Sequence, residues 1–252
     1  MFEEHPSFTS PPIDTTIWRY MDIAKYLSIL DKQALYFCSF DSFKDPYEGA
    51  YPARDVEMLK KHIVPDKDEE TTKRRVKTHL TGFRETALVN CWQIDEYEST
   101  AMWETYARNN LGIAIRSTYK RLRDCFDKYP MPVYIGVVKY IDYEKDSINH
   151  VNCFDPLLHK SKHYAWENEL RVIVVNELVD LYEPRPNLDI VDGGEYVNVN
   201  LDILIESIYL HPNSPQWFIN LISSVTNKYG LNKEIRPSKI LSGPQYIKEL
   251  TS

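Results

Sequence analysis

Two glutamates and an arginine stand at alternate positions where a polar segment of the sequence becomes apolar. Glu167, Glu169 and Arg171 occupy every second position in "AWENELRVIVV". In extended backbone they would share one side, with the two carboxylates about 6–7 Å apart. Such a pair can stabilise a developing positive charge and accept a proton. In the simpler alternative Arg171 neutralises Glu169 and Glu167 faces solvent.

The segment before the glutamates combines positive charge with aromatic surface, which favours an open ligand cleft. Its members are Lys160, Lys162, His163, Tyr164 and Trp166. A metal site is a second possibility, because His159, His163 and Glu167 recur every four residues and would share one helix face. The lysines between them oppose a cation, so we expect neutral or exposed histidines there.

Two residues nearer the N-terminus stand on predicted strands. Arg19 lies between Trp18 and Tyr20, so it would point away from both aromatics and would need an anion. That anion is either a ligand phosphate or a carboxylate in the loop "DSFKDPYEG", such as Asp45 or Glu48. Ser39 ends the apolar run "LYFCS", where its hydroxyl either caps the strand or faces a cleft.

The composition limits the classes of partner. The chain has 252 residues and a formal net charge of −7, which disfavours nucleic-acid binding through bulk charge. A local basic segment, "KRRVKTHLTGFR", is the exception, and it predicts contact with an anionic partner such as a nucleic acid, or else a solvated helix face. Its basic residues are Lys73, Arg74, Lys77 and Arg84.

Several motifs are missing from the sequence. The four cysteines form no CxxC pair, which argues against a zinc ribbon or a disulfide framework and fits a reducing cytosol. The chain has no glycine-rich phosphate loop and no GxSxG elbow. The acidic, proline-rich N-terminus does not resemble a signal peptide, and no apolar run reaches the ~18 residues of a membrane span. We therefore expect a soluble, cytoplasmic protein.

The apolar periodicity predicts an α+β fold with a central bent, mainly antiparallel sheet flanked by helices, formed as a single domain over 1–252. Strands are expected at 17–20, 35–40, 87–94, 111–117, 132–143, 170–175, 206–212 and 235–240, and a hairpin at 189–201. Helices are expected at 23–30, 98–110, 157–166 and 216–230, the second capped by Ser99 or Thr100 and the last ended by Gly230. Residues 55–86 are expected to form a charged helical insertion.

Five blocks of the sequence resemble successive blocks of the domain-of-unknown-function family 2971 (DUF2971), a mostly bacterial family. They are "IWRYM", "LYFCSFDSFKDPYEG", "NCWQIDEYESTAMWETYA", "LGIAIRS" and "KSKHYAWENELRVI". The order of a first-strand Arg, a strand-ending Ser and a late ExE is similar to the pattern of ADP-ribosyltransferases. Ser39 lies here in "CSF" rather than in an STS motif, and a long insertion separates it from Glu169.

The second resemblance implies an ADP-ribosyltransferase-like fold and an enzyme that moves ADP-ribose from NAD to a protein or nucleic acid, as a toxin or phage-defence effector. It makes Glu169 the catalytic acid, exposed in its cleft, and Glu167 the residue that orients or deprotonates the acceptor. Ser39 would support the nicotinamide side and Arg19 would anchor NAD. We expect Tyr20, Tyr36 or Trp166 to stack on nicotinamide.

Two alternatives stay open beside the transferase. A magnesium-dependent nuclease would use Asp155, Glu167 and Glu169 as metal ligands, although no lysine stands in the ExK position of such enzymes. A non-catalytic module would use an aromatic cleft to bind a nucleotide or a peptide.

Overall fold

The computed structural model describes residues 1–62, 69–148, 152, 154–175 and 193–243. Residue contacts group the chain into two compact units, described one at a time below. Unit 1 comprises Met1–Pro12, Leu35–Gln93 and Phe126–Asn198, and unit 2 comprises Ile13–Ala34, Ile94–Cys125 and Val199–Ser252. Each unit contains hydrogen-bonded β-strands together with helices, so the α+β expectation is confirmed.

The sheet of unit 1 is built around β3 (Ala87–Ile94) and β8 (Glu169–Val175), which pair antiparallel over seven residues. β8 also pairs antiparallel with β5 (Tyr134–Val137), and β3 with β2 (Ala34–Ser39), beside which lies β9 (Gly194–Asn198). The apolar run of β8 is buried as far as Val174, as expected of a strand covered on both faces. β8 thus carries Glu169 and Arg171 into the interior of the unit.

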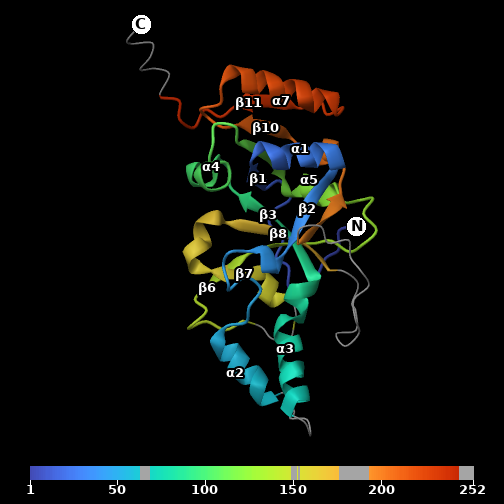
Figure 1. Ribbon diagram of the computed structural model, residues 1–252, viewed down its shortest axis with the longest axis vertical. Coiled ribbons are helices and arrows are strands. Elements are labelled where there is room, and N and C mark those ends of the chain that lie inside the picture. The colour runs from blue at the N-terminus through green and yellow to red at the C-terminus, as the bar shows by residue number, and fades with distance from the viewer. Residues whose placement is uncertain (63–68, 149–151, 153, 176–192, 244–252) are drawn as a thin grey trace. The chain divides into compact units, whose positions relative to one another are not determined.

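One face of this sheet is covered by short irregular elements. They are the 3₁₀ helices η1 (Phe40–Ser42), η2 (Asp155–Leu158) and η3 (Lys162–Glu167), and a small parallel sheet of β6 (Lys139–Ile141) and β7 (His159–Ser161). Phe40 and Leu157 pack with Val89 and Ile173 in an apolar cluster beside the charged residues. Helices α2 (Ala53–His62) and α3 (Glu69–Thr86) contact one another and form the expected charged insertion (Figure 1).

Unit 2 contains the strands in the order β11 (Glu234–Pro237), β10 (Ser207–Leu210), β4 (Ile113–Thr118) and β1 (Thr16–Met21). β1 and β10 each pair antiparallel with β4, whereas β10 and β11 are parallel. The helices of the unit are α1 (Ile23–Lys32), α4 (Thr100–Tyr106), α5 (Tyr119–Asp124), α6 (Leu201–Leu204) and α7 (Gln216–Lys228). Helix α7 lies along β11 (Figure 1).

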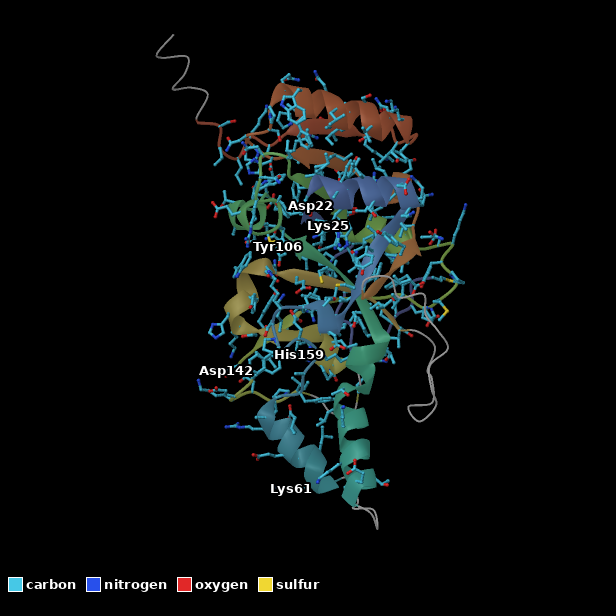
Figure 2. The ribbon with its side chains drawn as sticks, viewed as in Figure 1. Asp22, Lys25, Lys61, Tyr106, Asp142 and His159 are labelled. Carbon is cyan, nitrogen blue, oxygen red and sulfur yellow. The ribbon has the colours of Figure 1, made fainter. Side chains whose placement is uncertain are left out.

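Helix ends in unit 2 follow the local sequence signals. The Asp22 side chain accepts from the Lys25 backbone amide at 2.9 Å and begins α1, and Figure 2 shows these two residues together. Ser99 caps α4 in the same way, as predicted, by accepting from Met102 N. Gly230, at a φ of 77°, follows the end of α7, which confirms the predicted stop.

One predicted element was wrong, and two short α-helices were missed. Residues 157–166 do not form a helix, because His159–Ser161 pair with β6 as strand β7 and separate two 3₁₀ turns. Helices α5 and α6 were not predicted. The C-terminal arm of the hairpin at 189–201 is β9, and the rest of that hairpin lies outside the described residues. Among the described residues, no helix has the length and apolar character needed to cross a membrane.

Candidate functional site

Arg171 is the centre of a buried network of charged side chains in unit 1. Its guanidinium donates from Nε to Glu169 Oε1 at 3.0 Å and from Nη2 to Glu48 Oε2 at 2.5 Å. The third guanidinium nitrogen, Nη1, donates to the Leu157 carbonyl at 2.6 Å. The Arg171 side chain is 0% exposed, so every contact it makes is to protein. A planar five-donor fork suits this role, because a guanidinium can bind two carboxylates and a carbonyl at once.

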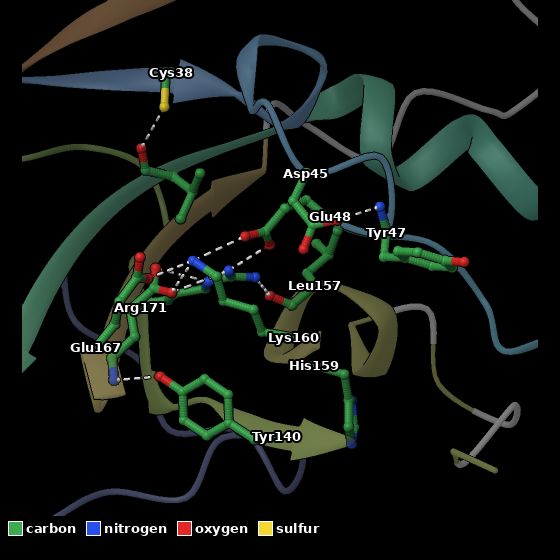
Figure 3. A network of polar contacts seen from close by, with 12 residues as sticks. Cys38, Asp45, Tyr47, Glu48, Tyr140, Leu157, His159, Lys160, Glu167 and Arg171 are labelled. Atoms are coloured by element: carbon green, nitrogen blue, oxygen red, sulfur yellow. Dashed lines mark hydrogen bonds and ion pairs between the residues drawn. The ribbon is translucent and has the colours of Figure 1, made fainter. Parts of the chain in front are cut away.

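Lys160, on β7, is the second cation of the network. Its ammonium lies 2.5 Å from Glu167 Oε2, 3.0 Å from Glu48 Oε1 and 3.2 Å from Glu169 Oε2. Figure 3 shows Lys160, Glu48 and Glu167 close to the guanidinium of Arg171. The cluster therefore provides three carboxylates around a single ammonium. Lys160 also lies 5.0 Å from the ring centroid of Tyr164.

The backbone between the two glutamates explains how both reach this place. Glu167 ends η3, and only Glu169 belongs to a strand, so the expectation of extended backbone at Glu167 was wrong. Asn168 between them adopts a left-handed conformation with a φ of 41°, which Asn tolerates better than most residues. This turn, rather than strand alternation, directs both carboxylates to Lys160. The Glu169 backbone amide donates to the Tyr140 hydroxyl at 2.8 Å and fixes the start of β8.

The charges of the cluster determine its protonation. Burial raises the pKa of Glu169, but Arg171 and Lys160 outweigh burial and hold that pKa well below its usual range. Burial lowers the pKa of Lys160, and the surrounding carboxylates raise it by more, so the ammonium stays charged. Three carboxylates and two cations leave a formal charge of −1 on the five side chains. Glu169 is therefore an ionised carboxylate inside a water-poor region.

Other buried polar groups surround the network. His159 Nδ1 lies 2.5 Å from the Asp155 carbonyl, and burial lowers the pKa of this imidazole. A neutral ring that donates from Nδ1 agrees with the sequence prediction for this histidine. Asp45 accepts from the Tyr47 amide through one oxygen, and its other oxygen is buried without a partner among the described residues. Asp155 Oδ2 is likewise buried without a partner among the described residues.

The structure does not assemble either predicted metal site. His163 is exposed on η3 while His159 is buried on β7, so they do not share a helix face with Glu167. The nuclease set of Asp155, Glu167 and Glu169 is not a metal site either, because Lys160 and Arg171 already pair with the two glutamates. Within the part of the chain that the structure describes, no three His, Cys, Asp or Glu side chains form a group that could hold a metal.

Three solved structures of one protein resemble this chain at low sequence identity. The chain is 9% identical to DarT from Thermus sp. 2.9, solved in complex with NAD+ and in complex with ADP-ribosylated ssDNA. Each alignment has a TM-score of 0.41 and covers 92% of this chain and 98% of the other. The DarT complex with carba-NAD+ aligns over 90% of this chain and 96% of the other, with a TM-score of 0.39 and 9% identity. At this level the alignments assign neither a fold nor an activity to the chain.

The sequence comparisons found no match. No protein-family model matches the chain. No curated protein matches it either. The resemblance to DUF2971 therefore remains a prediction.

The aromatic residues predicted to stack on nicotinamide lie in different surroundings. Tyr20 is buried, its ring packs edge-on against Trp103 at 5.0 Å, and its hydroxyl accepts from the Ser99 amide at 2.9 Å. Tyr20 is thus a core residue of unit 2, which corrects its assignment as a stacking surface. Tyr36 is half-buried, and Trp166 on η3 is 43% exposed.

Ser39 and Arg19 keep their predicted strand positions. The Ser39 hydroxyl accepts from the Asp41 amide at 3.3 Å and caps η1, so the strand-end reading of this residue is confirmed. Arg19 is half-buried on β1 opposite Ile115, whereas Trp18 is opposite Arg116. Adjacent strand residues face opposite sides, so Arg19 points away from Trp18, as expected.

The basic segment is helix α3, and its members do not all face solvent. Arg84 Nε lies 3.0 Å from Asp41 Oδ1 and ties the end of α3 to the turn after β2. Lys73 and Lys77 are exposed, whereas the side chain of Arg74 lies outside the described residues. Arg84 is therefore a structural contact, which narrows the predicted anion-binding set.

Sequence reasoning missed two members of the network. Glu48 appeared only as a possible partner of Arg19, yet it pairs with Arg171, which lies 123 residues further along the chain. Lys160 appeared as part of a cleft lining, not as the cation that joins three carboxylates. Tyr140, whose hydroxyl accepts from the Glu169 amide at the edge of the network, is a third residue that the sequence did not place there. Proximity in the fold, rather than spacing in the sequence, brings these residues together.

Proposed function

We propose that the chain is an ADP-ribosyltransferase that moves ADP-ribose from NAD to a macromolecular acceptor. The observation that carries the proposal is the group of three carboxylates around one ammonium, with Glu169 held ionised. Such an arrangement stabilises a localised positive charge without a metal ion. The proposal rests on the residues of this chain.

The reaction needs a developing cation next to Glu169. The bond between nicotinamide and C1′ of the ribose breaks, and its electron pair leaves with neutral nicotinamide. The ribose then acquires oxocarbenium character, which a carboxylate bonded to the 2′-hydroxyl stabilises. Of the three contacts of Lys160, the 3.2 Å contact to Glu169 is the longest, so it is the contact that a ribose hydroxyl would most readily replace.

The other residues complete the proposed site. The acceptor attacks C1′, and Glu167 takes the proton that the acceptor loses. Arg171 positions Glu169, and Ser39 supports the nicotinamide side. Arg19 belongs to unit 2, and its role as the anchor of NAD stays a prediction from the sequence. Tyr36 or Trp166 stacks on the nicotinamide ring. A nucleic-acid acceptor would contact α3 through Lys73 and Lys77, which are exposed.

A second candidate function is a non-catalytic binding module. The observation that favours it is the burial of the network: Glu169 is 3% exposed and Arg171 is 0% exposed. A buried cluster whose charges are all paired can have a purely structural role, in which it specifies the fold. In that case the exposed surfaces, such as Trp166, would bind a nucleotide or a peptide.

The test of the transferase is nicotinamide release from NAD by the purified protein, in a chelator, with cell lysate or single-stranded DNA as acceptor. We expect release together with label on the acceptor, and nuclease or protease digestion identifies the labelled polymer. Glu169→Asp keeps the charge beside Arg171 but withdraws the carboxylate, so it should lower the rate about 100-fold or more. Lys73→Glu/Lys77→Glu should reduce labelling of DNA, but not hydrolysis of NAD.

The controls separate the two candidates. Glu206→Gln removes a half-buried carboxylate that pairs with Arg116 in unit 2, and it should leave the rate unchanged. A wild-type protein that neither binds nor consumes NAD with any acceptor would exclude the transferase and leave the binding module. Full activity in Glu169→Asp would show that Glu169 does not act in the reaction.

A further inference from the structure

Gln93 lies beside Glu169 on the sheet of unit 1. The two residues are direct partners in the antiparallel pairing of β3 and β8. Directly opposite residues in such a pair point to the same face, with Cβ atoms about 4.5–5.5 Å apart. The amide of Gln93 therefore shares the sheet face that carries Glu169, and no helix or loop is needed to bring the two together.

The amide oxygen of Gln93 is buried and has no partner among the described residues. The residue is 2% exposed, and Oε1 accepts no hydrogen bond from any residue that the structure describes. The other buried amide of β3 differs, because Asn90 donates to the Tyr36 carbonyl at 2.9 Å and accepts from Trp92 Nε1 at 2.8 Å. Native folds satisfy most buried polar atoms, so an exception next to a charged cluster needs an explanation.

The chemistry of the pair selects the kind of ligand. Glu169 is an ionised acceptor and Gln93 Oε1 is a neutral acceptor on the same face, so a bound anion would be repelled by both. Lys160 and Arg171 already neutralise Glu169, which leaves no need for a metal ion. Two adjacent hydroxyl donors match two adjacent acceptors, and the vicinal diol of a ribose provides them.

We infer that Gln93 is a specificity-determining residue that accepts the 3′-hydroxyl of the nicotinamide ribose, while Glu169 accepts the 2′-hydroxyl. The inference rests on the proposed function, and it adds a preference for a ribose with both hydroxyls. Binding supplies the donor that the amide oxygen lacks in the free protein. A buried acceptor matched to a hydroxyl discriminates strongly against an analogue without that hydroxyl.

The experiment compares NAD with an NAD analogue whose nicotinamide ribose has no 3′-hydroxyl, by calorimetric titration of the full chain. Wild type should bind NAD at least tenfold more tightly than the analogue. Gln93→Met keeps the side-chain volume and removes the acceptor, so it should bind both ligands with the weaker affinity. Its melting temperature should not fall, because the amide oxygen makes no hydrogen bond in the free protein.

A matched control is Ser207→Ala. Ser207 is also buried, with an oxygen that has no partner among the described residues, but β10 does not pair with β8. This variant should keep the wild-type preference for NAD. Gln93→Asn keeps the acceptor on a shorter side chain and should retain part of the preference.

The outcomes distinguish this inference from the proposed function. Equal affinity of wild type for NAD and the analogue, or an undiminished preference in Gln93→Met, would overturn the role of Gln93 even in an active enzyme. A fall of several degrees in the melting temperature of Gln93→Met would also overturn it, by showing a structural role. A preference for NAD that Gln93→Met abolishes would support the inference, even without nicotinamide release. Absence of binding to either ligand would overturn both proposals.

Discussion

At the scale of one residue, the burial of Glu169 gives this carboxylate a structural role beside its proposed catalytic role. The sequence predicted an exposed cleft acid, and it also offered Arg171 as an ion-pair partner. The structure confirms the partner and contradicts the exposure, because Glu169 is 3% exposed and accepts two bonds from Arg171. A catalytic role and a structural role are therefore combined in one side chain.

This burial predicts a large loss of stability for Glu169→Gln. The amide can accept one bond from Arg171, but its NH₂ group then faces the donors of Lys160 and Arg171. Breaking a buried charge pair on one side costs about 3 kcal/mol. We expect a loss of this size in the free energy of unfolding, measured by urea titration.

The matched control for this prediction is Glu206→Gln. Its pair with Arg116 is partly open to water, with 31% of the Glu206 side chain exposed, and should contribute at most about 1 kcal/mol. Equal losses in the two variants would show that the buried network adds nothing beyond an ordinary surface pair.

At the scale of elements, regular apolar periodicity made the long elements predictable. Six elements lie where the pattern predicted them, because each has one continuous apolar face or run to bury: β1, β2, β3, β4, α1 and α7. Residues 157–166 also have helical spacing, yet β7 forms there because pairing with β6 outweighs local preference. The network could not be derived in full, since Glu48 and Lys160 reach Arg171 only through such irregular elements.

The turn at Asn168 makes the irregular segment testable. Its left-handed φ of 41° is accessible to Gly and strained for a β-branched residue. We expect Asn168→Gly to change the unfolding free energy by less than about 0.5 kcal/mol and Asn168→Val to lower it by about 1–2 kcal/mol.

Gln33, which ends α1 with a φ of 50°, gives the comparison, because it has a similar left-handed backbone and belongs to unit 2. A larger cost of Val at 168 than at 33 would measure the displacement of Glu167 from Lys160. Equal costs would show that the turn does not position the glutamate.

For the whole molecule, the buried charges link stability to pH. The pKa of Glu169 lies below its usual value in the folded protein, with burial opposing the shift and Arg171 and Lys160 producing it. Because the folded form holds the proton less tightly than the unfolded form, the stabilisation is complete above the unfolded pKa of 4.5 and is lost as the pH falls towards about 2.

Wild type should therefore lose unfolding free energy between pH 4.5 and about 2, and Glu169→Gln should lose less, so that the two curves approach each other in acid. Urea titrations at half-unit pH steps measure this difference between the two curves.

Asp146→Asn is the comparison. Hydrogen bonds from the Asp142 amide and Lys162 lower the pKa of Asp146, but that carboxylate is open to solvent. Its curve should stay closer to wild type, because water screens exposed pairs. Parallel curves for wild type and Glu169→Gln would mean that Glu169 is not held ionised by Arg171 and Lys160, which would also remove the main support for its part in catalysis.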